Sequence, residues 1–153
     1  MGAQANVGFS VVRFSDLGIG SDLVQSLWEE GIKEPFEVQI EAIPPAMEGR
    51  DICCRAPTGS GKTLAFGLPL IERVSKAESK RPTSLVLTPT RELAEQIRNV
   101  LDPLAANYGM DVLSVYGGTS YGKHRSGLDR GVEILVASLE ATPGSVIAYA
   151  ERI

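Results

Sequence analysis

The sequence predicts an α/β fold in which a parallel β-sheet is covered by helices. Two observations lead to this prediction. From residue 52 onward, short apolar runs of strand length alternate with longer segments of helical length, a pattern typical of parallel sheets buried on both faces. The loops rich in glycine or threonine also follow the ends of predicted strands. Because ligands of such sheets bind at the carboxyl ends of the strands, these loops are candidate binding segments.

Length and composition are those of one globular domain. The chain has 153 residues, 43% of them hydrophobic, and a net charge of -4, which argues against binding nucleic acid through bulk positive charge alone. The sequence shows no run of membrane-spanning length and no secretory leader pattern. The adjacent Cys53 and Cys54 are interpreted as small core residues of a protein in a reducing compartment. We therefore expect a cytoplasmic protein with no membrane partner.

The N-terminal region is predicted to be a tail followed by helices. Residues 1–13 lack periodicity and are expected to be flexible. A helix is predicted at 21–30, with Trp28 on its apolar face and therefore in the core. A second helix begins near Val38 and ends between residues 44 and 49.

The rest of the chain alternates between the two kinds of element. Strands are predicted at 52–55, 84–88, 111–116 and 133–137, and helices at 61–75, 91–106 and 142–152. Residues 120–128 are predicted to be a short, basic helix or a loop.

Residues 56–63, APTGSGKT, carry a phosphate-loop pattern between a predicted strand and a predicted helix. Gly59 and Gly61 let the backbone turn its N–H groups inward, and the helix N-terminus adds its dipole, so that an anion is held from several sides. Lys62 supplies a positive charge to the phosphates, and the Thr63 hydroxyl suits Mg²⁺. Ala56 stands where the general pattern has glycine. The predicted phosphate-binding residues are Ala56, Thr58, Gly59, Ser60, Gly61, Lys62 and Thr63, with Lys62 and Thr63 also proposed as catalytic and Thr63 as the metal ligand.

Together with the phosphate loop, three further segments make the chain resemble the DEAD-box family of ATP-dependent RNA helicases. They are the turn GIKEPFEVQ at 31–39 with Phe14 upstream, the segment PTREL at 89–93, and Gly117-Gly118-Thr119. The resemblance covers about residues 14–137. It implies a P-loop NTPase domain of the RecA-like type over residues 14–153, ATP or ADP with Mg²⁺ as cofactors, RNA as a partner, and a second RecA-like domain in the parent protein.

The turn at 31–39 resembles the adenine-recognition segment of that family. The resemblance implies that Gln39 reads the adenine edge and that Phe14 stacks near the base. An amide fits this role because its adjacent donor and acceptor match N6 and N7 of adenine. The alternative is a solvated Gln39 and a Phe14 that anchors the core. Phe36 stands where the family often has threonine. The implied nucleotide contacts are Phe14, Lys33, Pro35 and Gln39.

Three segments resemble RNA-contacting motifs of the family. In the PTREL segment, Thr90 is expected to cap a helix and Arg91 to meet a phosphate at that helix terminus. The glycines at 117–118 allow close approach of a sugar-phosphate backbone. The alternatives are an ordinary helix cap and a tight turn. The implied RNA contacts are Pro89, Thr90, Arg91, Gly117, Gly118, Thr119, Thr142 and Gly144, and binding to the isolated chain is expected to be weak.

Two departures from the family pattern limit the resemblance. Residues 138–153 diverge, because three residues intervene after Ala137 and Ser145 stands where the family has arginine. The sequence also contains no DEAD and no SAT motif. The carboxylates that would organise Mg²⁺ and activate water are therefore missing, and we expect little ATPase or unwinding activity.

The same departures predict an incomplete sheet. A domain that lacks sheet neighbours exposes strand edges, which favour self-association or strand exchange. The alternative to a piece of a helicase is thus a non-motor or engineered module that binds nucleotide or associates with itself. A small-molecule kinase would explain neither PTREL nor the glutamine turn.

Overall fold

The computed structural model describes residues 11–79, 81–117 and 121–138. The first ten residues of the tail predicted at 1–13, and the helix predicted at 142–152, lie outside this range. The elements are the 3-10 helix η1 (Phe14–Leu17), the helices α1 (Ser21–Glu29), α2 (Glu37–Met47), α3 (Lys62–Arg73), α4 (Arg91–Ala106) and α5 (Tyr121–Arg130), and the strands β1 (Ser84–Thr88), β2 (Val112–Val115) and β3 (Ile134–Ser138). No helix within the described ranges is long and apolar enough to cross a membrane.

The three described strands form one parallel sheet in the order β1-β3-β2. Leu135 of the central strand is in register with Leu85 on one side and Leu113 on the other. Every residue of β3 is buried, as expected for a central strand covered on both faces. The predicted α/β class with a parallel sheet is therefore confirmed.

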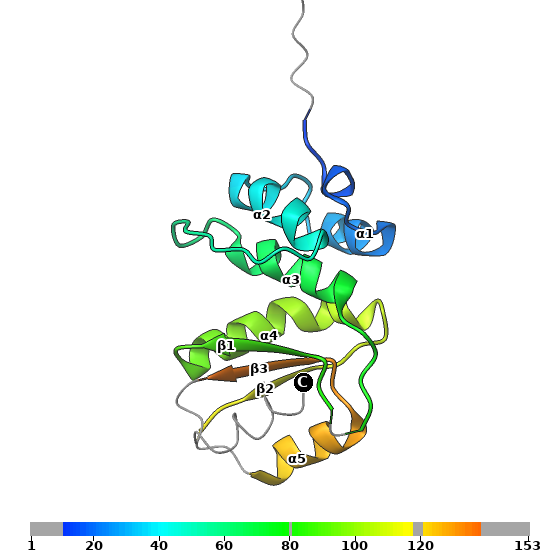
Figure 1. Cartoon of the computed structure of the whole chain (residues 1–153), viewed down its shortest axis with the longest axis vertical. Coiled ribbons are helices and arrows are strands. Elements are labelled where there is room, and N and C mark those ends of the chain that lie inside the picture. Colours follow the sequence, from blue (N-terminus) through cyan, green and yellow to red (C-terminus); the bar gives the residue numbers. More distant parts are fainter. Residues whose placement is uncertain (1–10, 80, 118–120, 139–153) are drawn as a thin grey trace, which may run out of the picture.

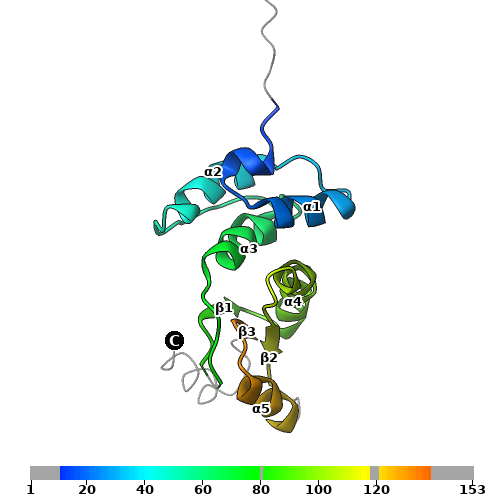
Figure 2. The ribbon, with the colours of Figure 1, turned by 90° about the vertical axis from the view of Figure 1, so that its right-hand side faces the viewer.

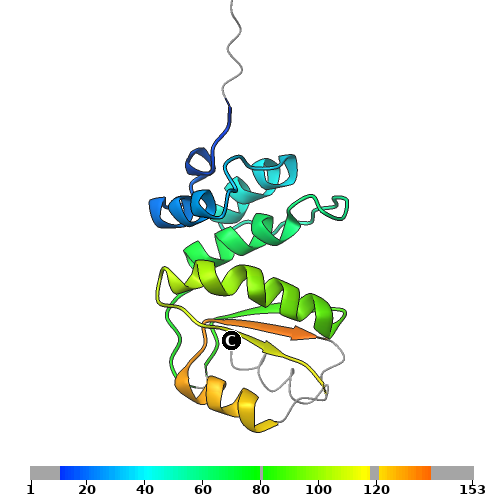
Figure 3. The ribbon, with the colours of Figure 1, turned by 180° about the vertical axis from the view of Figure 1, so that it is seen from behind.

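Helices cover both faces of this sheet (Figures 1 and 3), α4 on one face and α5 on the other. The alternation along β3 divides its side chains between two clusters. Ile134 and Val136 belong to the large core shared with the helices from η1 to α4, while Leu135 packs with Val115 and Leu128 of the smaller α5 side. This is the period-two pattern of a strand buried on both sides.

Further helices lie beyond α4, on the side away from the sheet (Figure 2). Helix α3 packs against α4, and α1 and α2 pack on α3. Gly67 permits the close approach of α3 to α4, because a Cβ at this position would collide with the Leu101 side chain. Glu72 of α3 also accepts a hydrogen bond from the Gly20 N–H (2.7 Å), which fixes the start of α1.

The predicted place of Trp28 in the core is wrong. The buried face of α1 is formed by Leu23 and Leu27, and Trp28 follows Leu27 by one residue, about 100° around the helix. Its side chain is 56% exposed, and the Lys33 ammonium lies 4.7 Å from the centre of its ring.

The predicted strand at 52–55 is also wrong, because these residues form no regular structure and are exposed. A strand needs a hydrogen-bonded neighbour, and among the described residues β1 pairs only with β3. The segment lies across an apolar cavity from β1, so no partner reaches it. As a consequence Cys53 and Cys54 are exposed free thiols rather than core residues.

Candidate functional site

The phosphate-loop segment has the local geometry that its glycines predict. Gly59 and Gly61 adopt left-handed φ angles of 79° and 83°, and α3 begins immediately afterwards at Lys62. No side chain caps this helix, so its first N–H groups have no intrahelical acceptor. A helix N-terminus of this kind, preceded by a glycine loop, is suited to binding an anion.

Glycine is required at position 61 by contacts as well as by the backbone angle. A Cβ built there would collide with the Gln39 side-chain nitrogen and lie 2.8 Å from the Phe36 ring. Helix α2 therefore approaches the start of α3 so closely that only a residue without a side chain fits. The glutamine turn and the phosphate loop, far apart in sequence, form one site.

Gln39 makes the connection between these two segments. Its side chain is 1% exposed; Oε1 accepts a hydrogen bond from the Phe36 N–H (2.8 Å) and Nε2 donates to the Gly61 carbonyl (3.0 Å). The alternative of a solvated glutamine is therefore wrong. One further N–H and one further lone pair of the amide remain for another partner.

Lys62 lies over the loop that precedes it. Its ammonium donates hydrogen bonds to the carbonyls of Ala56 (2.6 Å) and Pro57 (2.7 Å). The Ser60 hydroxyl donates to the same Pro57 carbonyl (2.7 Å). The positive charge of the site is thus held at the mouth of the loop, where an anion would meet it.

The other residues predicted from the glutamine turn behave differently. Phe14 is 2% exposed and belongs to the large core, and its stacking on a base stays a prediction. The alternative assignment of Phe14 as a core anchor is correct. Pro35 is half-buried, and the Lys33 ammonium is turned toward Trp28.

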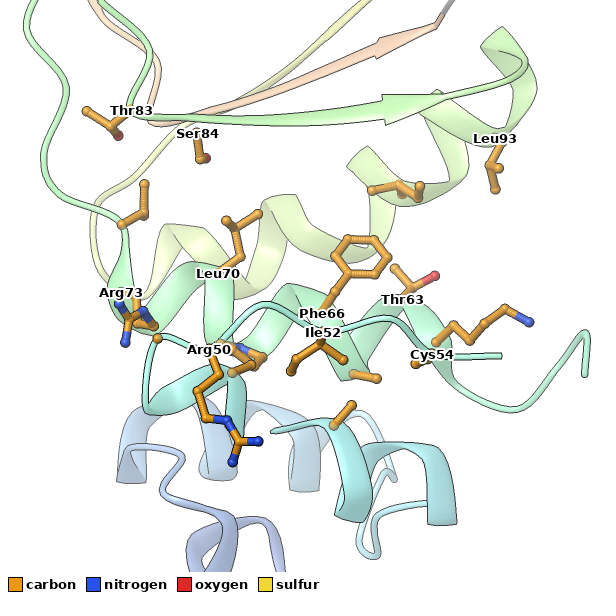
Figure 4. A pocket seen from close by; sticks show the side chains of 18 residues that line it. Arg50, Ile52, Cys54, Thr63, Phe66, Leu70, Arg73, Thr83, Ser84 and Leu93 are labelled. Atoms are coloured by element: carbon orange, nitrogen blue, oxygen red, sulfur yellow. The ribbon is translucent and has the colours of Figure 1, made fainter. Parts of the chain in front are cut away.

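Two cavities adjoin the loop. One of about 740 Å³ lies between the start of α2 and residues 52–60, with Phe36, Glu37, Glu41 and Arg55 among its lining. The other, of about 720 Å³, lies between α3 and β1 (Figure 4); Thr63 and Leu93 are at one end of it, Thr83 and Ser84 are at the other, and the Phe66 side chain projects between them. Both cavities are of a size that holds a small molecule.

Thr63 is the metal ligand predicted from the sequence. Thr63 lines the second cavity, and its hydroxyl is a hard ligand, but one hydroxyl leaves most of the coordination to phosphate oxygens and water. Within the described residues no group of three or more His, Cys, Asp or Glu could hold a metal. The donor set therefore fits Mg²⁺ only when it arrives with phosphates.

The PTREL segment follows β1 at the edge of the sheet where the carboxyl ends of the strands meet. The Thr90 hydroxyl accepts a hydrogen bond from the Leu93 N–H (3.3 Å), so Thr90 caps α4 as predicted. Exposed Arg91 forms an ion pair with Glu92 (3.1 Å). A hydrogen bond from the backbone N–H of Glu92 is the largest cause that lowers the pKa of this carboxyl, and the hydrogen bond from the Arg91 side chain is the second. A phosphate at Arg91 would compete with that carboxylate.

Gly117 reaches the same edge, because β2 is parallel to β1 in the sheet. Pro89 and Thr90 are exposed there. The structure thus brings Pro89, Thr90, Arg91 and Gly117 to one edge, while Gly118, Thr119, Thr142 and Gly144 lie outside the described residues.

A polar cluster beside Gly117 gave no signal in the sequence. The Ser114 hydroxyl donates a hydrogen bond to Glu95, and Arg98 lies 3.9 Å from the same carboxylate. Burial, with Glu95 nearby, raises the pKa of Tyr116. These residues come from α4 and β2, so only the tertiary structure brings them together.

Phe36 was likewise not predicted as a site residue, although its difference from the family pattern could have drawn attention to it.

A glycine loop at a helix N-terminus, followed by lysine and threonine and set against a parallel α/β sheet, defines the class of P-loop nucleotide-binding proteins. A sequence model of the DEAD/DEAH box helicase family matches residues 36–151. The chain belongs to this family. The match runs into the region after residue 138, for which residue-by-residue divergence stays a prediction.

Relatives and solved structures agree with this assignment. The chain is 41% identical over 143 residues to "DEAD-box ATP-dependent RNA helicase 9, mitochondrial" of Arabidopsis thaliana, covering 90% of this chain and 22% of the relative. It is 40% identical to the RNA helicase CrhR of Synechocystis, covering 91% of this chain and 27% of that protein. The chain thus spans about a quarter of such relatives.

Two solved structures share the fold. The RNA helicase Prp28 from Chaetomium thermophilum, whose structure holds ADP, aligns with a TM-score of 0.78 at 37% identity over 92% of this chain and 34% of that one. A DEAD box protein from Methanococcus jannaschii aligns with a TM-score of 0.78 at 30% identity, over 92% of this chain and 37% of its own. The fold is that of a RecA-like helicase domain.

Proposed function

We propose that this chain is the N-terminal part of an ATP-dependent RNA helicase and that it binds an adenine nucleotide between the glutamine turn and the phosphate loop. The observation that carries the proposal is the link from buried Gln39 to Gly61 (3.0 Å). It joins the segment expected to recognise a base to the segment expected to hold phosphates. The ADP-bound helicase among the structural neighbours supports it.

The nucleotide would be divided between the two segments. The N–H groups at the start of α3 and the Lys62 ammonium would hold the phosphates, with Lys62 giving up its bonds to loop carbonyls. Mg²⁺, if it is bound between phosphate oxygens and Thr63, would neutralise phosphate charge. Gln39 has one N–H and one lone pair left for the edge of adenine.

RNA would bind at the carboxyl edge of the sheet. Thr90, Arg91 and Gly117 are gathered there, and the α4 N-terminus favours a phosphate. We expect this binding to be weak and salt-sensitive, because few phosphates can be neutralised by so small a set of cations. The relatives that are described as RNA helicases support an RNA partner.

The whole activity requires more than this sequence contains. The sequence has no DEAD or SAT motif, and the relatives are about four times as long. We propose that a second RecA-like domain completes the motor, and that the chain by itself has little ATPase or unwinding activity. A cytoplasmic location stays a prediction, since relatives include a mitochondrial protein.

Calorimetric titration of ATP, ADP and adenosine into the chain and into Lys62→Ala tests the nucleotide site. The variant removes a charge that meets only phosphates, so ATP binding should weaken about ten- to a hundredfold, the size of a charge-assisted hydrogen bond. Adenosine binding should stay within about twofold. An equal loss for ATP and adenosine would contradict the phosphate assignment.

A second candidate function, self-association, is favoured by the free edge of β1. Among the described residues β1 pairs only with β3, and Leu87 on β1 is 53% exposed. Free strand edges pair with other chains. Light scattering coupled to size exclusion would decide this point, because a strictly monomeric mass at high concentration would exclude self-association.

A further inference from the structure

The cavity of about 720 Å³ between α3 and β1 extends well beyond the proposed nucleotide site. Lys62 and Thr63 line it at the start of α3, and Arg73 lines it at the end of that helix. From Lys62 to Arg73 the helix axis rises by about 17 Å. Most of the cavity therefore lies away from the cations and N–H groups that the phosphates of a nucleotide would use.

The walls of this cavity are mostly apolar. The large apolar residues among its lining are Ile52, Phe66, Leu70, Val74, Leu93 and Ile97. The Phe66 side chain projects into the space between the two ends (Figure 4). Phe66 is 39% exposed and Ile52 is 41% exposed, so this apolar surface is in contact with water. Covering such surface is the main source of affinity for a small molecule in a cavity of this size.

The charged side chains that line the cavity are all basic. They are Arg50, Lys62 and Arg73, and no Asp or Glu is found among the lining residues that the structure describes. Lys62 is held over the phosphate loop by the carbonyls of Ala56 and Pro57. The charge at the other end of the cavity therefore comes from the two arginines.

The two arginines lie in the same part of the cavity. Arg73 donates a hydrogen bond to the Met47 carbonyl (2.7 Å), and a Cβ on Gly49 would lie 2.8 Å from Arg73 Nη2. The guanidinium of Arg73 thus packs against the segment that leads into Arg50. Arg50 lies 3.8 Å from Glu48 in an exposed ion pair, which contributes little. Because a guanidinium has five N–H donors, Arg73 can bind an anion and Met47 together.

We propose that this cavity binds a small amphipathic anion, an apolar molecule that carries one carboxylate, sulfonate or phosphate group. The anionic group pairs with Arg73 and Arg50. The apolar body lies along Leu70 and Phe66 toward Leu93. The inference does not rest on the proposed nucleotide site, because the pairing cations are at the opposite end of α3 from the phosphate loop.

The test is fluorescence titration of the full chain with two dyes that share an aromatic body, anionic anilinonaphthalenesulfonate and neutral phenylnaphthylamine. Arg73→Gln keeps a donor for the Met47 carbonyl and removes the charge. We expect it to bind the sulfonate dye about tenfold more weakly, the lower end of the range for a charge-assisted hydrogen bond. The neutral dye should bind Arg73→Gln within about twofold of its affinity for the unsubstituted chain.

Phe66→Ser removes apolar surface from the cavity and should weaken both dyes about tenfold. Val100→Ser is the matched control, because Val100 is 38% exposed on α4 and does not line the cavity. Both dyes should bind Val100→Ser as they bind the unsubstituted chain. ADP added to the dye-loaded chain should leave the dye bound, whether or not the nucleotide site exists.

Four results would overturn the proposal. Equal weakening of the two dyes in Arg73→Gln would show that the charge does not select an anion. Unchanged binding to Phe66→Ser, or displacement of the dye by ADP, would place the dye elsewhere. A second copy of the chain is the competing occupant. If it covers the cavity, dye fluorescence per chain will fall over the concentrations at which light scattering detects a dimer.

Discussion

Gln39→Met gives a quantitative test of the link between the glutamine turn and the phosphate loop. Methionine keeps the length and most of the volume of glutamine, so the change removes hydrogen bonds without opening a cavity. Two backbone groups lose their partner, the Phe36 N–H and the Gly61 carbonyl. An unpaired buried polar group costs about 1–3 kcal/mol. Because both groups are only partly buried, we expect a total loss of about 2–3 kcal/mol.

The free energy of unfolding, from urea denaturation followed by circular dichroism, measures this loss. The expected loss is a large fraction of the ~5–15 kcal/mol that stabilises a domain. Gln25→Met is the matched control. Among the described residues, the Gln25 side chain bonds only to exposed Glu29 (2.7 Å), so its removal should change stability by less than about 0.5 kcal/mol. If Gln39→Met costs no more than Gln25→Met, the link does not hold the loop.

The same variant tests recognition of the base. Gln39 is the residue expected to read adenine, so Gln39→Met should lose preference for ADP over GDP as well as stability. Calorimetric titration with both nucleotides measures the preference. If the variant still prefers ADP as strongly as the unsubstituted chain, the adenine contact lies elsewhere and Gln39 only positions the loop.

Two further substitutions test other contacts of the structure. Glu92→Gln removes the carboxylate that competes for Arg91 (3.1 Å), so RNA should bind more tightly in a fluorescence titration at low salt. Because the pKa of Glu92 is lowered, the gain in RNA affinity should persist at neutral pH and vanish only in acid. No gain at neutral pH would mean that Arg91 does not contact RNA. Buried Glu133 accepts hydrogen bonds from the N–H groups of Ala77 (3.0 Å) and Asp111 (2.9 Å). Glu133→Ala should therefore lower the free energy of unfolding, measured by urea denaturation, by about 2–4 kcal/mol. An unchanged free energy of unfolding would refute the stabilising role of the Glu133 carboxylate.

Segments whose structure depends on local pattern were predictable from the sequence. The helix predicted at 91–106 is α4 with the same bounds, and the strand at 84–88 is β1. Thr90 caps α4 as its position predicted. In each case the signal lies within one element, as a capping residue, a 3.6-residue period or a short apolar run.

The errors came from features that depend on distant residues. Residues 52–55 have the composition of a strand, but a strand forms only with a neighbour, and the described residues provide none. Trp28 was placed in the core because the helical pattern gave α1 a wide apolar face that included Trp28. Only Leu23 and Leu27 of that face are buried. The burial of Phe14 likewise has no local signal, because it is decided by how η1 packs on the helices.

The phosphate loop is positioned by helices rather than by a strand of the described sheet. Gln39 connects it to α2, and α3, which begins at its end, packs on α4 through Gly67 and Leu101. Helix α4 begins at the segment that carries Thr90 and Arg91. The candidate nucleotide and RNA segments therefore lie at the N-termini of two helices in direct contact. Because packed helices can shift as rigid units, we expect a displacement of α3 at the loop to move α4, and with it Arg91, through the contact between Gly67 and Leu101.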